Sequence, residues 1–160
     1  MEQSILIRPI RREDGEALAG LIRATLKAHG LDIPGTAYWD PSLGDLPLAY
    51  RAENSGYLVM ERGGSPGGGG GYAPIGLFPE CCELQKLYLA PELQGRGLGR
   101  RLLEAVEHSA RAAGYRRIYL ETHSRLGRAV RLYRAAGYRQ ILRPEGVVHS
   151  AMDLFFLKEL

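Results

Sequence analysis

The sequence predicts an α/β fold with a mixed, mostly antiparallel sheet of six to seven strands flanked by about four helices. Two observations lead to this prediction. Between residues 83 and 122 a strand, a helix and a second strand follow one another, which is the order of a parallel βαβ crossover. The other expected strands are joined by short connections, and these favour antiparallel pairing.

The first half of the chain begins with a strand at residues 4–10 (SILIRPI). Residues 16–27 carry leucine and isoleucine at helical spacing, and Gly30 is the expected end of that helix. Three prolines then interrupt residues 31–50, so only a short helix at about 43–50 is predicted there.

Two further strands are expected at residues 56–62 and 72–79. Between them lies a glycine-rich stretch that ends in five consecutive glycines at 67–71. A nucleotide-binding loop would need a following Lys-Ser/Thr pair and a helix, and neither is present. We therefore predict that residues 63–71 form a flexible hairpin connection.

In the second half of the chain, the sequence pattern predicts alternating strands and helices. In order, these are a strand at 83–89, a helix from 98 to about 113, a strand at 116–122, a helical stripe at 126–136 that ends at Gly137, and strands at 138–142 and 150–157. No internal repeat is visible in the chain.

The apolar pattern changes parity within the fourth expected strand. Cys82 and Leu84 precede two consecutive polar residues, and Leu87 and Leu89 follow them. A one-residue slip would send apolar side chains to the wrong face, so the pattern predicts a β-bulge at about residues 86–88. An imperfect pattern without a bulge is the alternative.

Composition and charge restrict the class of protein. The 160 residues are 45% hydrophobic and 24% charged, as expected for one globular domain spanning residues 1–160. No apolar stretch approaches the roughly 20 residues of a membrane-spanning helix, and the N-terminus lacks signal-peptide features, so a cytoplasmic protein is expected. The net charge of +3 fits solvated helix surfaces or attraction for a phosphorylated ligand.

Neither disulfide bonds nor a metal site is expected. The two cysteines, Cys81 and Cys82, are adjacent, and a bridge between neighbouring strand residues would be badly strained. The four histidines show no paired spacing typical of zinc. A nucleophilic role for either cysteine is disfavoured because no histidine stands in a recognisable partner position.

A glycine-rich turn at residues 94–99 (QGRGLG) connects the fourth strand to the following helix. Glycines at 95, 97 and 99 let the backbone approach a ligand, and the helix start presents free N–H groups to an anion. Arg96 and Arg100 add positive charge. The spacing differs from the dinucleotide-binding pattern, and an ordinary strand–helix turn is the alternative interpretation.

The stretch from residue 82 to 103 (CELQKLYLAPELQGRGLGRRLL) resembles the acetyl-CoA signature of the GNAT superfamily of N-acetyltransferases. Its Gln94-x-x-Gly97-x-Gly99 matches the family's Gln/Arg-x-x-Gly-x-Gly/Ala motif. Residues 129–138 (AVRLYRAAGY) resemble the second family signature, a helix bearing Leu-Tyr followed by Gly-Phe/Tyr. One departure is Leu126, where many members carry asparagine, so a polar contact to pantetheine from this position is not expected.

The resemblance implies the GNAT fold, acetyl-CoA as cosubstrate and transfer of acetyl to a primary amine of a small metabolite, amino acid or peptide. It implies that backbone amides from Gly95 to Arg100 bind the pyrophosphate and that Leu87 and Leu89 meet pantetheine through their main chains. The residues expected at the cofactor are Leu87, Tyr88, Leu89, Gln94, Gly95, Arg96, Gly97, Leu98, Gly99, Arg100, Leu126, Ala129 and Tyr133.

Two catalytic residues are expected on the same grounds. Tyr133 is the candidate proton donor to the departing thiolate, with a purely structural core aromatic as the alternative. Glu83 is the candidate general base, with a carboxylate paired to an arginine as the alternative. His123 either lines the acceptor cleft or lies in a solvent-facing loop. The acceptor wall is expected from the stretch that carries His29, Asp32, Tyr38, Trp39, Asp40 and Asp45.

Two other functions remain open from the sequence. One is a catalytically silent CoA-binding sensor. The other is a basic nucleic-acid-binding module, although no aromatic-basic stacking motif supports it; we expect no nucleic-acid or membrane partner. Exposed strand edges would allow a homodimer to form. The sequence does not identify the substrate that accepts the acetyl group.

Overall fold

The computed structural model describes residues 3–148 and 150–160, and these residues build one seven-stranded sheet in the order β1-β2-β3-β4-β5-β7-β6. Only β4 and β5 are parallel, and the other neighbouring pairs are antiparallel. The predicted mixed sheet and its single crossover are therefore confirmed. The strands are β1 (Ile5–Pro9), β2 (Gly56–Arg62), β3 (Ser65–Pro74), β4 (Cys81–Leu89), β5 (Arg117–Thr122), β6 (Arg139–Ile141) and β7 (Leu154–Glu159).

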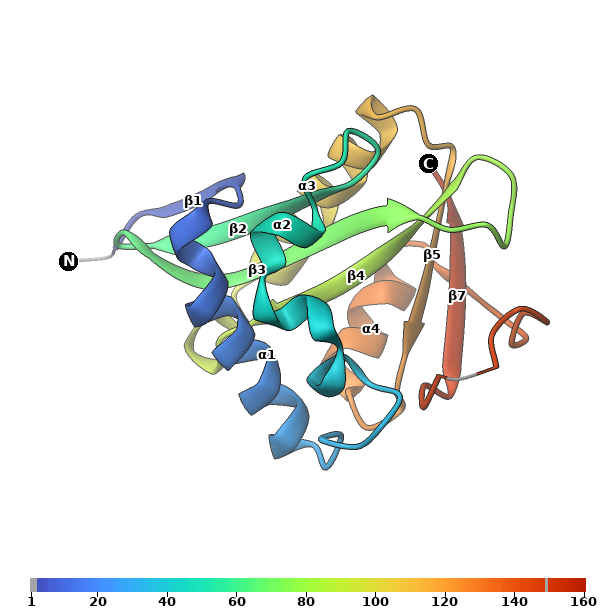
Figure 1. Cartoon of the computed structure of the whole chain (residues 1–160), viewed down its shortest axis with the longest axis horizontal. Coiled ribbons are helices and arrows are strands. Elements are labelled where there is room, and N and C mark those ends of the chain that lie inside the picture. Colours follow the sequence, from blue (N-terminus) through green and yellow to red (C-terminus); the bar gives the residue numbers. More distant parts are fainter. Residues whose placement is uncertain (1–2, 149) are drawn as a thin grey trace.

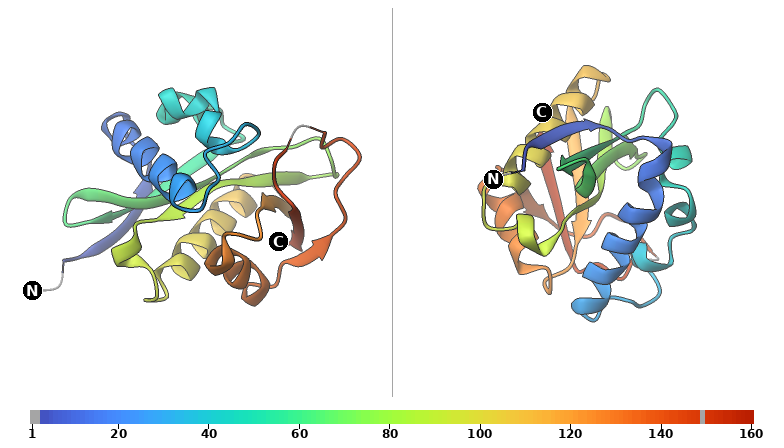
Figure 2. Two further views of the ribbon diagram at one scale, coloured as in Figure 1. Left: turned by 90° about the horizontal axis from the view of Figure 1, so that it is seen from below. Right: turned by 90° about the vertical axis from the view of Figure 1, so that its left-hand side faces the viewer.

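Helices cover both faces of the sheet (Figures 1 and 2). On one face lie α1 (Gly15–Ala28) and the short α2 (Leu46–Ala49), and on the other lie α3 (Leu98–Ala112) and α4 (Gly127–Ala135). Leucines and isoleucine of α1 pack with Tyr57 and Val59 of β2 in one core cluster. Leu103, Val106 and Ala110 of α3 pack with β4 and β5 in a second cluster. No helix among the described residues is long and apolar enough to cross a membrane.

The last strand begins later than the sequence pattern predicts. It starts at Leu154, whereas residues 150–153 are irregular and His149 lies outside the described residues. The amide of Ala151 donates to the Gly35 carbonyl over 3.1 Å, and the amide of Asp153 donates to the Thr122 carbonyl over 3.2 Å. These loop contacts take the amides that a strand would have used in its ladder.

The five glycines at 67–71 form part of strand β3, so the prediction of a flexible connection there is wrong. They pair with β2 on one side and with β4 on the other. Large neighbouring side chains occupy the space above them: a Cβ on Gly70 would lie 2.5 Å from Leu87 Cδ1, and one on Gly71 would lie 2.7 Å from Tyr57 Cδ2. Side chains of neighbouring residues thus fill the space that side chains at 67–71 would occupy. The low intrinsic strand propensity of glycine does not reveal this packing.

Strand β4 contains the predicted bulge. Its ladder with β3 jumps from Gln85↔Gly71 to Tyr88↔Gly69, so Lys86 and Leu87 stand opposite Gly70 alone. Lys86 has a φ of 52°, in the left-handed region. Because of this extra residue, Leu84 and Leu87 both pack in the cluster beneath α3, as the parity change in the sequence requires.

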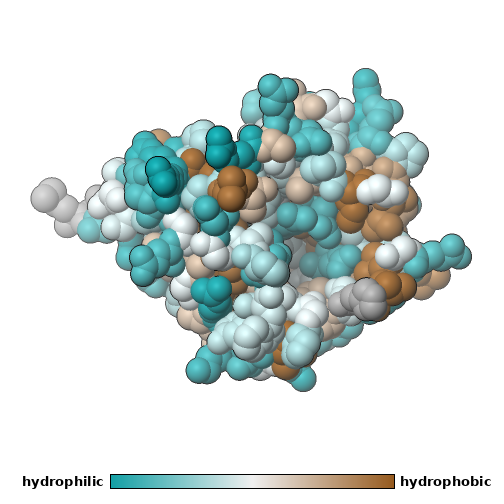
Figure 3. Space-filling view, viewed as in Figure 1, coloured by the Kyte–Doolittle hydropathy of each residue, from teal (hydrophilic) through white to brown (hydrophobic). Residues whose placement is uncertain are grey.

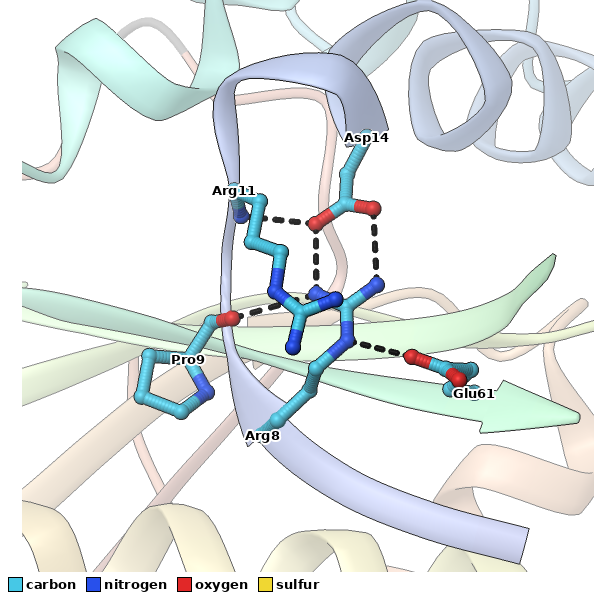
Figure 4. A network of polar contacts seen from close by, with 5 residues as sticks. All are labelled: Arg8, Pro9, Arg11, Asp14 and Glu61. Atoms are coloured by element: carbon cyan, nitrogen blue, oxygen red, sulfur yellow. Dashed lines mark hydrogen bonds and ion pairs between the residues drawn. The ribbon is translucent and has the colours of Figure 1, made fainter. Parts of the chain in front are cut away.

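A buried ion-pair network fixes the start of α1 to the sheet (Figure 4). The Arg8 guanidinium of β1 donates to both carboxylate oxygens of Asp14 over 2.7 and 2.9 Å and to Glu61 of β2 over 2.5 Å. Asp14 also accepts a hydrogen bond from the Arg11 amide. The hydrogen bonds from the Arg8 side chain are the main reason that the pKa of Asp14 lies below its ordinary value. The network therefore orients the helix that forms one wall of the cleft described below.

Replacing Arg8 with alanine is expected to lower the free energy of unfolding by about 3–5 kcal/mol, because Asp14, only 1% exposed, would be left as an uncompensated buried charge. Urea unfolding followed by circular dichroism measures this loss. The double variant Arg8→Met, Asp14→Leu removes both charges and should recover most of the stability. An Arg8→Ala protein as stable as the parent chain would contradict the argument.

Candidate active site

The main cleft opens where β4 and β5 separate. The two strands pair only from Cys81 to Glu83 on β4, and beyond Glu83 no described strand pairs with the β5-facing side of β4 (Figure 1). The cleft has a volume of about 1430 Å³ and is lined by β4, β5, α4, the end of α1 and the segments at 35–40, 146–148 and 150–152. Figure 3 shows the molecule hollowed near the centre of this face. The splayed strands therefore offer a long groove with backbone groups along one side.

The glycine turn forms one end of this cleft and is built to receive an anion. Gly95 and Gly97 both have a φ of +74°, and Gly97 is the N-cap of α3. A Cβ on Gly97 would meet nothing within 4 Å, so backbone conformation rather than space requires glycine there. Left-handed glycines on either side of Arg96, together with a helix N-terminus, direct backbone N–H groups toward the mouth of the turn, which favours phosphate oxygens.

Most of the residues expected at the cofactor line this cleft. They are Leu87, Tyr88, Leu89, Gln94, Gly95, Gly97, Gly99, Arg100, Leu126, Ala129 and Tyr133. Arg96 is not among the lining residues, and Leu98 is buried with Met60, Leu93 and Leu102, so only the main chain of Leu98 remains for a ligand.

Two polar side chains of the turn face the protein itself. Gln94 Nε2 donates to the Leu89 carbonyl over 3.0 Å and so ties the turn to the end of β4. The Arg100 guanidinium donates to Glu104 over 3.0 Å and to the Ala135 carbonyl at the end of α4 over 3.2 Å. The Arg100 side chain thus joins α3 to α4, and it also lines the cleft, as the sequence predicts.

Arg128, which sequence reasoning missed, supplies positive charge from the opposite wall. It lies in the first turn of α4, and its Nη1 is 3.8 Å from the position that a Cβ on Gly95 would take. Among the described residues it forms no hydrogen bond or ion pair, and Arg131 one turn later also lines the cleft. In the sequence these arginines are indistinguishable from a solvated helix face; only the meeting of α4 with the glycine turn reveals them.

Glu83 lies on the floor of the cleft and is half-buried. It accepts a 2.5 Å hydrogen bond from Gln85 Nε2, and Gln85 in turn accepts from the Tyr50 hydroxyl over 2.8 Å. No described arginine pairs with it, so the alternative interpretation of an arginine-bound carboxylate fails. Burial raises the pKa of Glu83, and the neighbouring Glu121 raises it further.

Tyr133 lies at the boundary between the core and the cleft. Its ring is 5% exposed and packs against Tyr138 and Phe156 at centroid distances of 5.7 and 6.3 Å. It also lines the cleft, and its hydroxyl forms no hydrogen bond with another described residue. Burial raises the pKa of this phenol, so it carries its proton at neutral pH.

The acceptor wall is only partly the predicted one. His29, Trp39 and Asp40 line the cleft. Asp32, Tyr38 and Asp45 do not, because they serve local structure: the Asp32 carbonyl accepts from Trp39 Nε1, the Tyr38 ring packs against Trp39, and the Asp45 carboxylate caps α2.

The remaining candidates lie outside the reacting centre. His123 does not line the cleft; its Nε2 is 3.7 Å from an Asp153 carboxylate oxygen. Cys81 and Cys82 are buried free cysteines, and burial raises the pKa of their thiols to about 11 and about 12. At neutral pH they are therefore protonated and poor nucleophiles.

Comparison with known proteins identifies the family that uses such a cleft. The sequence model described as Acetyltransferase (GNAT) family matches residues 24–138. The uncharacterized N-acetyltransferase YjgM of Escherichia coli is 35% identical over 99% of this chain and 96% of its own length. The chain belongs to the GNAT family. It is an acetyl-CoA-dependent N-acetyltransferase.

Other GNAT relatives cover smaller parts of the chain or share only the fold. The spermine/spermidine N(1)-acetyltransferase of Bacillus subtilis is 35% identical over 43% of this chain and 51% of its own length. A GNAT acetyltransferase of Staphylococcus aureus superimposes with a TM-score of 0.86 at 19% identity, covering 98% of this chain and 99% of its own. The acetyltransferase yncA of Salmonella typhimurium, whose structure contains its cofactor acetyl-CoA, gives a TM-score of 0.75 at 22% identity, covering 97% of this chain and 93% of its own.

The residues of this GNAT cleft fit acetyl-CoA. The left-handed glycines and the nearby Arg128 suit a pyrophosphate, and the open side of β4 suits an extended arm that carries amides.

Proposed function

We propose that this enzyme transfers acetyl from acetyl-CoA to a primary amine of a small metabolite, amino acid or peptide by direct attack in a ternary complex. The observation that supports this most is that one cleft joins an anion-binding turn, a buried phenol and a carboxylate of raised pKa. The Bacillus subtilis relative is named for spermine and spermidine, which are primary amines.

Acetyl-CoA supplies an activated thioester whose carbonyl carbon accepts the amine nitrogen. In this proposal the amides from Gly95 to Arg100, with Arg128, bind the pyrophosphate, and main-chain groups from Leu87 to Leu89 pair with the amide-rich arm. An N–H of the bulge at Lys86 and Leu87 then donates to the carbonyl oxygen as negative charge develops on it.

Two side chains move protons. An amine attacks only as the free base, so Glu83 removes its proton, directly or through a water molecule. The electron pair of the broken C–S bond leaves on sulfur, and the Tyr133 hydroxyl protonates it. The proton that the attacking nitrogen loses as it becomes the amide nitrogen restores the phenol. Both side chains line the same cleft, Glu83 from β4 and Tyr133 from α4.

The test is thiol release from acetyl-CoA in the presence of a panel of amines. Amine-dependent release is expected, and Tyr133→Phe should lower kcat by about a hundredfold without weakening acetyl-CoA binding, because only the hydroxyl is removed. Binding is measured by the rise in melting temperature. Acetyl-CoA binding without release for any amine would instead favour the CoA-binding sensor.

A cytoplasmic location, a single-domain organisation and the lack of a nucleic-acid partner stay predictions from the sequence. Salt-sensitive binding of random DNA at submicromolar strength would contradict the last of these.

A further inference from the structure

Tyr57 reaches from β2 across β3 to the bulge of β4. Its hydroxyl donates to the Lys86 carbonyl over 2.8 Å. Tyr57 stands in register with Gly71 of β3, and Gly71 in turn stands in register with Gln85 of β4. Because neighbouring strands lie about 4.8 Å apart, the ring has to pass over the whole width of β3 to make this hydrogen bond.

The glycine run of β3 leaves the space for that ring. A Cβ on Gly71 would lie 2.7 Å from Tyr57 Cδ2, and a Cβ on Gly69 would lie 2.9 Å from Tyr57 Cζ. Both distances are well below the roughly 3.5–4.0 Å at which carbon atoms normally touch, so a side chain at either position would displace the ring. Glycines inside a strand weaken it, and here they allow a side chain of β2 to reach β4.

The Tyr57 hydroxyl is buried inside the protein. Tyr57 is 3% exposed, and its ring packs against the ring of Tyr50 with 5.2 Å between the centroids. Burial raises the pKa of the Tyr57 phenol, and the neighbouring Tyr50 and Tyr88 raise it further. The hydroxyl therefore keeps its proton at neutral pH and remains a donor to the Lys86 carbonyl.

The hydrogen bond from Tyr57 fixes a strained part of the backbone. Lys86 has a φ of 52°, which is unfavourable for a residue with a side chain and persists only where the surroundings determine it. Tyr57 holds the Lys86 carbonyl, and Asp40 holds Lys86 Nζ over 2.9 Å. The Lys86 carbonyl and the Leu87 N–H belong to one planar trans peptide unit and point in opposite directions. Fixing the carbonyl therefore also fixes the N–H.

Resting on the proposed function, in which an N–H of this bulge donates to the thioester carbonyl, we infer that Tyr57 is a positioning residue for acetyl transfer. Its hydroxyl holds the peptide unit between Lys86 and Leu87 in the orientation that directs the Leu87 N–H at the developing oxyanion. The glycine run at 67–71 serves the same purpose, because it gives the Tyr57 ring its path across β3. A donor that is oriented in advance stabilises the developing charge without any reorganisation of the protein.

Removing the Tyr57 hydroxyl alone tests this inference. Tyr57→Phe keeps the ring over the glycines and should lower kcat for thiol release by about a hundredfold, the cost of misplacing a group at the reacting centre by roughly 1 Å. KM for acetyl-CoA should stay unchanged. The matched control is Tyr115→Phe, which removes a hydroxyl that donates to the Asn54 carbonyl over 2.6 Å and does not line the cleft; its kcat should equal that of the parent enzyme. A lower melting temperature of Tyr57→Phe at unchanged kcat would overturn the inference, because it would show a purely structural hydroxyl.

A spectroscopic measurement decides the inference without turnover. In ¹H–¹⁵N spectra of the parent protein, acetyl-CoA should move the Leu87 amide proton downfield relative to CoA, because only acetyl-CoA carries the carbonyl. Tyr57→Phe should still bind both ligands, seen as a rise in melting temperature, but should lose this difference. The same difference in the variant, or its absence in the parent protein, would overturn the inference. If no amine is acetylated while the difference is present in the parent and lost in Tyr57→Phe, the proposed function fails and the positioning role of Tyr57 stands.

Discussion

Replacement of Gly97 by aspartate is expected to abolish the binding of acetyl-CoA. Gly97 adopts a φ of +74° at the N-cap of α3, where an L side chain is strained. An aspartate would also place a negative charge where the helix dipole and N–H groups favour phosphate. The parent protein should gain about 2.7 kcal/mol of stability at 100 Kd of ligand, seen as a rise in melting temperature, and the variant should gain none.

Gly97→Asn is the matched control, because asparagine has nearly the same shape, carries no charge and tolerates the left-handed conformation better than most residues. It should keep part of the ligand-induced rise in melting temperature. Both variants should fold, since a Cβ at this position would meet nothing within 4 Å. A full rise in the aspartate variant would show that the turn does not hold the phosphates.

The two glycine-rich segments show where reading the sequence succeeds and where it stops. The turn at 94–99 is recognisable because closely spaced glycines mark a local backbone conformation, and Gly95 and Gly97 do adopt a positive φ. The run at 67–71 has no local signal for a strand. It is one because Tyr57, Leu87 and other neighbours fill the space above it, and packing between distant residues is invisible in the local sequence.

The candidate site divides in the same way. The bulge in β4 follows from the parity of four apolar residues, and the family resemblance points to Glu83 and Tyr133 in the cleft. Arg128 and Glu121 could not be found, because neither stands in a motif. They reach the site only through the separation of β4 from β5 and the approach of α4 to the glycine turn, which are properties of the assembled fold.

Glu83→Gln is expected to lower kcat by about a hundredfold at neutral pH, which is within the usual contribution of a general base. A glutamine cannot accept the proton that the substrate ammonium must lose before its nitrogen attacks. In the parent enzyme kcat should rise with pH through the pKa of Glu83, which lies above the ordinary carboxyl value because of burial and of Glu121. The variant should lack that rise, and its deficit should shrink as the pH nears the amine's own pKa, about 10 for an alkyl ammonium. Initial rates measured across this range, with Glu53→Gln as a control of equal charge, provide the comparison.

Stability separates a catalytic role of Glu83 from a structural one. Because the folded pKa of Glu83 is raised, the folded state binds this proton more tightly than the unfolded state does. The stability linked to this group is present at low pH and is lost as the pH rises through the folded pKa. At neutral pH the neutral glutamine avoids burying that charge, so the variant should melt at the same temperature as the parent or higher. A lower melting temperature together with a pH-independent loss of activity would mean that Glu83 supports the fold of β4 rather than removing a proton.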